Sequence, residues 1–188
     1  GEPRRRPRHA MNDARIFLIG AGPGDPSLLT VKGHQYLTTA DVIVYDHLVH
    51  QRMLSLARPD AETIDVGAAT PRPLDQDAIC LLLAEKAREG KTVARLKWGD
   101  PFVFGGGGKE ALFLHEQGVP FEVVPGILPG IGGPTFAGIP VTYPDAGDTL
   151  TFVRGHEGET STPPKVAWNH LAQVPGTIVS YGAGPQLA

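Results

Sequence analysis

The chain has 188 residues, of which 41% are hydrophobic and 20% charged, a composition typical of a soluble protein with one domain, or one domain and part of another. Its formal net charge of −3 gives no electrostatic reason to expect nucleic acid or an anionic membrane as a partner. No apolar run approaches the ~20 residues of a membrane span. The single cysteine, Cys80, excludes an internal disulfide framework and fits a reducing cytoplasm.

The first residues are set apart from the expected fold by their composition. Residues 1–10 are basic and proline-rich, and no apolar segment follows them, so they do not predict a secretory signal. Met11 is a candidate start of the native protein. We therefore expect residues 1–13 to form a flexible basic leader.

From Arg15 onward, short β-rich runs alternate with longer amphipathic runs, and glycine or proline separates them. The runs that predict strands are Arg15–Ile19, Val42–Tyr45, Thr63–Val66, Thr92–Lys97 and Phe121–Val124. The runs that predict helices are Ser27–Thr39, His50–Ala57, Asp75–Glu89 and Lys109–Gln117, with a glycine-rich helix after Pro129. This alternation predicts an α/β fold whose mostly parallel, doubly wound sheet is flanked by helices.

The alternation changes near residues 143–148. Two further strand candidates follow, Thr149–Val153 and Thr177–Tyr181, with a loop-like segment at 157–164 between them. A parallel sheet has to be covered on both faces, and no helical pattern follows the second of these strands. We therefore expect an N-terminal α/β domain over residues 14–147 and the start of a truncated C-terminal α/β domain over 148–188.

The five expected strands of the first domain all end in loops that carry small residues. In open α/β sheets, ligands bind outside the carboxyl ends of the strands, and glycine lets the backbone approach a flat or bulky ligand. We therefore expect one ligand site at this edge, and five tight turns without a ligand are the less favoured interpretation. The loops contain Gly20–Pro26, Asp46-His47, Gly67–Ala69, Gly99–Gly108 and Pro125–Gly130.

The first loop, GAGPGDP, has part of a dinucleotide-binding pattern. The third glycine of that pattern is replaced by Asp25, and Pro23 removes an amide that could have faced a pyrophosphate. Asp25 followed by Pro26 is typical instead of a helix N-cap with proline at the first helical position. Asp46 closes the second strand, where a dinucleotide domain keeps its ribose-binding acid. An NAD-type site is therefore the weaker alternative.

Several motifs occur in the order and at the spacing of a known family. They are GAGPGDP at 20–26, YDHLV at 45–49, GDPFVFG at 99–105, VVPGI at 123–127 and AGIP at 137–140. Together they resemble the S-adenosylmethionine-dependent tetrapyrrole methylases over roughly residues 15–181. Residues 151–156 also resemble the start of the second domain of that family.

The resemblance implies two α/β domains, usually in a homodimer, with S-adenosyl-L-methionine as methyl donor and S-adenosyl-L-homocysteine as product. It implies C-methylation of a small-molecule tetrapyrrole, uroporphyrinogen III, to give precorrin-2 on the way to sirohaem or cobalamin. It also implies which positions contact the cofactor, the last two of them through backbone or shape. These are Pro23, Gly99, Asp100, Val103, Leu128 and Pro129.

Asp46 matches the acid of the family that faces the tetrapyrrole and accepts a proton, so the resemblance makes it the catalytic candidate. An electron-rich pyrrole carbon that attacks a methyl group leaves a cation, which a carboxylate can stabilise or deprotonate. The alternative is that Asp46 only caps the following loop. No metal is expected, because His47 and His50 could share a helix face but no cysteine or carboxylate array completes a site.

The chain departs from the family pattern where cations are usual. Ala68-Ala69 replace a basic pair, Gly105–Gly108 lack a basic residue, and Trp98 replaces a small one. The carboxylates of uroporphyrinogen III need cationic partners. Two alternatives therefore stay open, namely a methyltransferase of the same superfamily with another substrate, and a non-catalytic module that binds a nucleoside. Side chains that could compensate are His47, Arg52, Arg72, Lys97, Lys109 and Arg154.

Overall fold

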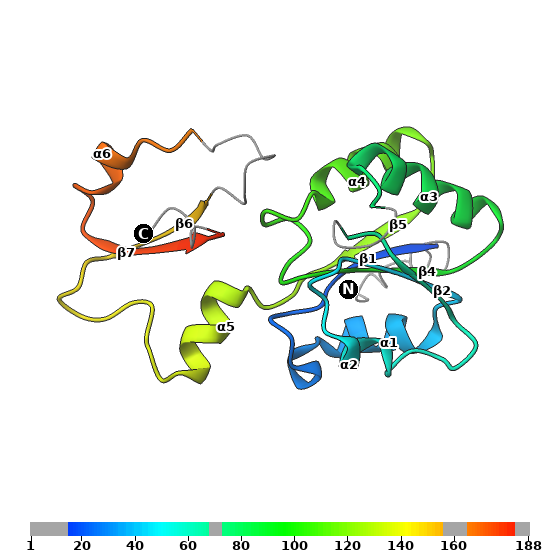
Figure 1. Ribbon diagram of the computed structural model, residues 1–188, viewed down its shortest axis with the longest axis horizontal. Helices are drawn as coiled ribbons and strands as arrows, with labels where there is room; N and C mark the ends of the chain where they lie inside the picture. Colours follow the sequence, from blue (N-terminus) through cyan, green and yellow to red (C-terminus); the bar gives the residue numbers. More distant parts are fainter. Residues whose placement is uncertain (1–14, 68–72, 156–164, 183–188) are drawn as a thin grey trace, which may run out of the picture. The chain divides into compact units, whose positions relative to one another are not determined.

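The computed structural model describes residues 15–67, 73–155 and 165–182. The expected leader at 1–13, the pair Ala68-Ala69, Arg72 and the loop-like segment at 157–164 lie outside the described residues. Contacts divide the chain into two units, Gly1–Ile127 and Leu128–Ala188, whose elements are labelled in Figure 1.

The first unit is built on a five-stranded sheet within the described residues. The strands lie in the order β3-β2-β4-β1-β5, and each neighbouring pair is parallel. The expected parallel α/β fold is therefore confirmed, and each of the five strands begins and ends within one residue of its expected bounds. The strands are β1 (Ile16–Gly20), β2 (Val42–Tyr45), β3 (Glu62–Asp65), β4 (Val93–Lys97) and β5 (Phe121–Val124).

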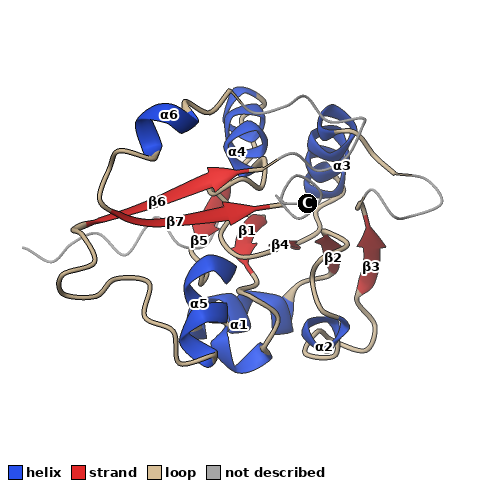
Figure 2. Ribbon diagram, turned by 60° about the vertical axis from the view of Figure 1, so that its left-hand side comes forward, coloured by secondary structure: helices blue, strands red, loops and turns tan. Residues whose placement is uncertain are grey.

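Helices cover both faces of this sheet. Figure 2 shows α3 and α4 on one side of the sheet and α1 and α2 on the other. Ile16 and Leu18 of β1 pack with α3 and α4, whereas Phe17 of the same strand packs with α1 and α2. Because successive side chains alternate across a strand, β1 is buried on both faces, and the inner strands β1 and β2 are almost continuously apolar. The helical segments are η1 (Pro26–Leu28), α1 (Val31–Thr39), α2 (Gln51–Leu54), α3 (Gln76–Arg88) and α4 (Gly107–Glu116).

The second unit contains α5 (Pro129–Phe136), β6 (Thr149–Arg154), α6 (Trp168–Leu171) and β7 (Gly176–Tyr181). The strands β6 and β7 pair in parallel, and their bounds agree within one residue with those of the two expected strands. The Gly130 N–H donates to the Tyr181 hydroxyl over 2.9 Å, and a Cβ at Gly130 would lie 2.6 Å from the Val179 side chain. Because α5 packs on β7, the boundary between the two units lies before α5. The change in loop composition along the sequence had instead predicted a domain boundary at residue 147.

Cys80 is a free cysteine buried on α3. Burial raises the pKa of its thiol, so the side chain stays protonated and acts as a small apolar group. Within the part of the chain that the structure describes, no helix has both the length and the apolar character needed to cross a membrane.

Candidate functional site

The loops after β1 and β4 are joined at the carboxyl edge of the sheet. The Gly22 N–H donates to the Gly99 carbonyl over 3.1 Å, and the Gly99 N–H donates to the Gly22 carbonyl over 3.0 Å. This bridge holds the loop that carries Pro23 against the loop that carries Asp100 and Val103. Four of the predicted cofactor-binding residues therefore come from two adjoining loops at one edge.

Bare backbone is needed where these loops meet the loop after β5. A Cβ at Gly20 would lie 2.5 Å from the Gly126 nitrogen and 2.6 Å from the Gly99 carbonyl oxygen. A Cβ at Gly126 would lie 2.2 Å from the same oxygen. Neither position accepts a side chain without movement of backbone atoms, so peptide groups rather than side chains form this part of the edge.

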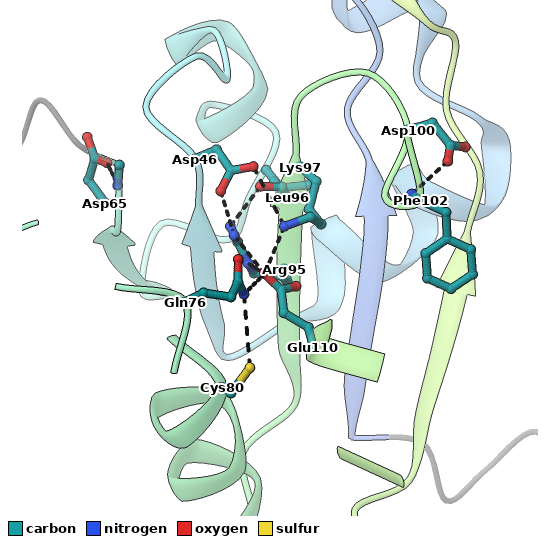
Figure 3. Close-up of polar contacts among 11 residues, drawn as sticks. Asp46, Asp65, Gln76, Cys80, Arg95, Leu96, Lys97, Asp100, Phe102 and Glu110 are labelled. Atoms are coloured by element: carbon teal, nitrogen blue, oxygen red, sulfur yellow. Dashed lines mark hydrogen bonds and ion pairs between the residues drawn. The ribbon is translucent and has the colours of Figure 1, made fainter. Parts of the chain in front are cut away.

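Asp100 fastens two of the loops together. Its Oδ1 accepts from the Phe102 N–H over 2.9 Å, as drawn in Figure 3, and its Oδ2 accepts from the Gly126 N–H over 3.1 Å. Each carboxylate oxygen has a second lone pair, so Asp100 can also accept from an amino or hydroxyl group of a ligand. The half-buried Val103 adds an apolar side chain to the same loop. Acceptor, apolar wall and close backbone together suit a nucleoside.

Asp25 has a structural role in the first loop. Its Oδ1 accepts from the Ser27 hydroxyl over 2.7 Å and from the Ser27 N–H over 2.8 Å, and these hydrogen bonds lower the pKa of Asp25. The prediction that Asp25 is a helix cap is confirmed. The capped segment is the short helix η1, and α1 begins separately because Thr30 Oγ1 accepts from the Gly33 N–H over 3.0 Å.

Asp46 directly follows β2, and its side chain faces β4. Arg95 Nη2 donates to Asp46 Oδ1 over 2.5 Å, and Lys97 Nζ lies 3.9 Å from Asp46 Oδ2. The Asp46 side chain is 27% exposed, whereas Arg95 and Lys97 are each 1% exposed. The turn that follows is closed by the Asp46 backbone carbonyl, which accepts from the Val49 N–H over 2.9 Å. A buried cation thus fixes one carboxylate oxygen of a side chain that retains access to solvent.

Glu110, on the first turn of α4, completes a buried cluster that Figure 3 shows converging on Arg95. Its Oε1 accepts from Lys97 Nζ over 2.8 Å, from Arg95 Nη2 over 3.1 Å and from Gln76 Nε2 over 3.2 Å. Glu110 is fully buried, and its Oε2 has no hydrogen-bond partner among the described residues. We call Asp46, Gln76, Arg95, Lys97 and Glu110 the Arg95 cluster.

The pKa shifts within the Arg95 cluster follow from burial and from its paired charges. Burial acts to raise the pKa of Glu110, but the cations of Arg95 and Lys97 outweigh it and hold that pKa below its ordinary value. Burial also acts to lower the pKa of Arg95, but the carboxylates of Glu110 and Asp46 raise it. For Lys97, burial and the neighbouring Arg95 lower the pKa in spite of the two carboxylates.

The structure overturns the suggestion that Lys97 could bind carboxylates of the substrate. Its ammonium group is buried and donates to Glu110. Of the other suggested cations, His47, Arg52 and Lys109 are exposed in the first unit, and Arg154 is exposed on β6 of the second unit. His47 Nδ1 lies 3.3 Å from Asp65 Oδ2.

The glycine run after β4 has a local cause in the fold. Gly106 has a φ of 72°, in the left-handed region that favours glycine, and a Cβ there would lie 2.3 Å from Gln76 Oε1. Gln76 occupies the space beside Gly106 and donates to Glu110. A basic side chain at position 106 would therefore have to displace Gln76.

Leu128 and Pro129 belong to the second unit. Leu128 is the N-cap residue of α5 and Pro129 is its first residue, a position where the missing N–H of proline is tolerated. The Leu128 carbonyl accepts from the N–H groups of Ile131 and Gly132 over 2.9 and 2.8 Å. Contacts of Leu128 and Pro129 with a cofactor stay a prediction.

Reasoning from the sequence did not identify Arg95 and Glu110, although a signal was present. Arg95 and Lys97 are two residues apart on a strand that was expected to be buried, so their side chains enter the same layer. Buried charges need partners of opposite sign. The first turn of the next helix supplies such a partner in Glu110.

The parallel sheet, with glycine-rich loops and an anchored carboxylate at its carboxyl edge, defines an open-sheet α/β protein, a class whose ligands bind beyond the carboxyl ends of the strands. Residues 15–188 match the family model of the tetrapyrrole (corrin/porphyrin) methylases. The chain belongs to this family, as its motifs suggested.

Similar proteins of known name support this assignment. A uroporphyrinogen-III C-methyltransferase from Sinorhizobium sp. is 48% identical over 93% of this chain, and the chain spans 62% of the length of that relative. The native uroporphyrin III C-methyltransferase of Thermus thermophilus has a TM-score of 0.77 and 40% identity, with 92% of this chain and 72% of that chain covered. A second structure from T. thermophilus, complexed with S-adenosyl homocysteine, has a TM-score of 0.72 and 41% identity, with 89% and 65% covered.

Proposed function

We propose that this protein is an S-adenosyl-L-methionine-dependent C-methyltransferase that converts uroporphyrinogen III to precorrin-2, a step toward sirohaem and cobalamin. The names of its relatives support the reaction, and the complex of one of them with S-adenosyl homocysteine supports the cofactor. The observation that carries the proposal is Asp46, a solvent-accessible carboxylate anchored by Arg95 at the glycine-rich edge of the sheet.

The loops at this edge would hold the cofactor. Pro23 and Gly99 lie on the bridged loops, Asp100 offers an acceptor for an amino or hydroxyl group, and Val103 offers an apolar wall. Leu128 and Pro129 would add backbone or shape contacts. The mutual fit of Gly20, Gly99 and Gly126 favours a rigid loop frame, and holding the reacting atoms in line is the main task of a methyltransferase.

The reaction assigns a defined task to Asp46. When bound, S-adenosyl-L-methionine would supply an electrophilic methyl group: a pyrrole carbon would form the new C–C bond as the C–S bond broke, with the electron pair of that bond left on sulfur. The resulting positive charge lies on the tetrapyrrole. The Asp46 carboxylate stabilises this charge and accepts the proton that is then lost. Arg95 holds Oδ1 of Asp46 in place during this step.

A second candidate is methyl transfer by the same site to a substrate with fewer carboxylates. Two features support it, because each leaves one cation fewer for the carboxylates of uroporphyrinogen III. Lys97 is buried, and a basic side chain at position 106 would have to displace Gln76. A non-catalytic nucleoside-binding module is the third possibility, and binding of cofactor without any transfer would identify it.

We further propose that the protein works in the cytoplasm as a homodimer. Its family membership and its single buried cysteine support this setting. Native mass spectrometry measures the oligomeric state directly, and a monomer at micromolar concentration would rule out the dimer.

The function is tested by incubating the chain with methyl-labelled S-adenosyl-L-methionine and uroporphyrinogen III. We expect label in the tetrapyrrole and S-adenosyl-L-homocysteine in equal amount. Label in a different acceptor from a cell extract, with none in uroporphyrinogen III, would favour the second candidate. Calorimetry with S-adenosyl-L-homocysteine and, as a control, NAD separates a methyltransferase site from a dinucleotide site.

A further inference from the structure

We propose that Lys97 and Glu110 are positioning residues, which act through the Arg95 cluster to set the charge and the orientation of the Asp46 carboxylate. The inference rests on the proposed function in one respect, namely that Asp46 is the catalytic residue. Neither Lys97 nor Glu110 touches the substrate in this account, because both side chains are buried.

Arg95 transmits the position of Glu110 to Asp46. Its Nη2 donates to Asp46 Oδ1 over 2.5 Å and to Glu110 Oε1 over 3.1 Å. Its Nε also donates to Glu110 over 3.3 Å, and its Nη1 donates to the Leu96 carbonyl over 3.2 Å. The guanidinium plane is therefore fixed by two groups behind it, and the planar fork then fixes the direction from which Asp46 is held.

Lys97 provides the second contact. Its ammonium group lies 2.8 Å from Glu110 Oε1 and 3.9 Å from Asp46 Oδ2, the oxygen that Arg95 does not bind. The two cations and two carboxylates balance when all four are ionised. Removal of one charge leaves the cluster with a net charge. This net charge acts on Asp46 at short range in a largely buried setting, where screening by solvent is weak.

The placement of the cluster favours a functional role over a purely structural one. Buried ion pairs are often no more stabilising than apolar side chains of similar volume, and this cluster lies beside the apolar layer between the sheet and α3 and α4. The cluster also reaches solvent through Asp46, at 27% exposure, whereas Glu110 and Lys97 are closed off. Such an arrangement anchors one accessible carboxylate from behind.

Every element packed around Asp46 contributes to its electrostatic setting. Glu110 from α4 acts through Arg95, and Gln76 from α3 donates to Glu110. His47 and Asp65 pair with each other beside the Asp46 loop. Among the residues of the Arg95 cluster, only Lys97 and Glu110 can be substituted so that the buried charge changes while Arg95 and Asp46, and so their direct hydrogen bond, are kept. The groups around Asp46 are Arg95 and Lys97 from β4, Glu110 from α4, Gln76 and Cys80 from α3, Asp65 from β3 and the adjacent His47.

The test compares Lys97→Met with Glu110→Gln in the full chain. Loss of the cation should move the acid limb of the kcat–pH profile upward by about one pH unit, and loss of the carboxylate should move it downward by up to about one unit. In both variants kcat should fall at least tenfold while KM for S-adenosyl-L-methionine stays within about threefold. A role limited to stability predicts no pair of shifts with opposite signs.

Lys86→Met is the matched control, because Lys86 forms an ion pair with the exposed Glu62 on the rim of the same unit. It makes the same chemical change and should leave the pH profile in place. Lys97→Arg should restore most of the activity and the position of the acid limb, since it keeps the charge.

A readout that needs no activity separates this inference from the proposed function. Carbon NMR of the Asp46 carboxyl group at constant pH should show its resonance displaced in opposite directions in Lys97→Met and Glu110→Gln, because the two variants remove charges of opposite sign. Absence of methyl transfer by the wild-type chain, with both shifts present, would sink the proposed function alone. An unmoved resonance, or displacements of the same sign in folded variants, would overturn the positioning role. Failure of both variants to fold in the presence of S-adenosyl-L-homocysteine would assign the cluster to stability instead.

Discussion

Glu110→Gln is the substitution whose effect on stability follows most directly from the structure. It leaves a side chain of the same shape but removes the charge that faces Lys97 and Arg95. Removing one partner of a buried ion pair costs about 3–5 kcal/mol. Asp46 still offsets part of the positive charge, so we expect about 3 kcal/mol. For a chain of this length that corresponds to a fall in Tm of about 6–12 °C.

The effect of Glu110→Gln should also depend on pH. The pKa of Glu110 is lower in the folded protein than its ordinary value of 4.5. Its stabilisation is therefore fully present above that value and is lost as pH falls through the folded-state pKa. The difference in unfolding free energy between wild type and variant should shrink on going from about pH 7 to about pH 3.

Chemical denaturation followed by circular dichroism measures both quantities. Glu62→Gln is the matched control, because the Glu62 side chain is 51% exposed where it pairs with Lys86. This variant should lose at most about 1 kcal/mol of stability. A loss at Glu110 no larger than at Glu62, or a difference that is constant with pH, would refute the reasoning about the buried charge.

Two further predictions concern the loop frame. Gly20→Ala should destabilise the protein by more than about 2 kcal/mol, because its Cβ would overlap backbone atoms. The control Gly108→Ala, in open space on α4, should instead stabilise the protein by about 0.5–1 kcal/mol. Equal denaturation midpoints for the two variants would contradict the close approach of backbone atoms to Gly20. Asp100→Ala should weaken binding of S-adenosyl-L-homocysteine in calorimetry by roughly tenfold or more, since one charged hydrogen-bond acceptor contributes about 1.5–3 kcal/mol; an unchanged Kd would remove Asp100 from the site.

Much of the first unit could be predicted because its strands carry strong local signals. The runs at Val42–Tyr45 and Phe121–Val124 were placed with their observed bounds. The first of them is continuously apolar, as is usual for a strand buried on both faces. The cap at Asp25 was also predictable, because Asp-Pro at a helix start has a local cause. The separate start of α1 at Thr30 was missed, since two caps in succession compete within one periodic segment.

The Arg95 cluster could not be read from local pattern. Arg95 is paired with Asp46 and Glu110, which lie 49 and 15 residues away in the chain, and only the strand order that places β2 beside β4 brings Asp46 close. The role of Gln76 in filling the space at Gly106 depends on packing between α3 and the start of α4. The division before α5 likewise follows from its packing on β7.

The central claim is that Asp46 serves methyl transfer and not cofactor binding, and Asp46→Asn tests it most directly. Single-turnover transfer of labelled methyl from S-adenosyl-L-methionine to uroporphyrinogen III should fall about 10²–10⁴-fold, while the Kd for S-adenosyl-L-homocysteine stays within about threefold. Transfer at the wild-type rate by a variant that binds the cofactor normally would contradict the account.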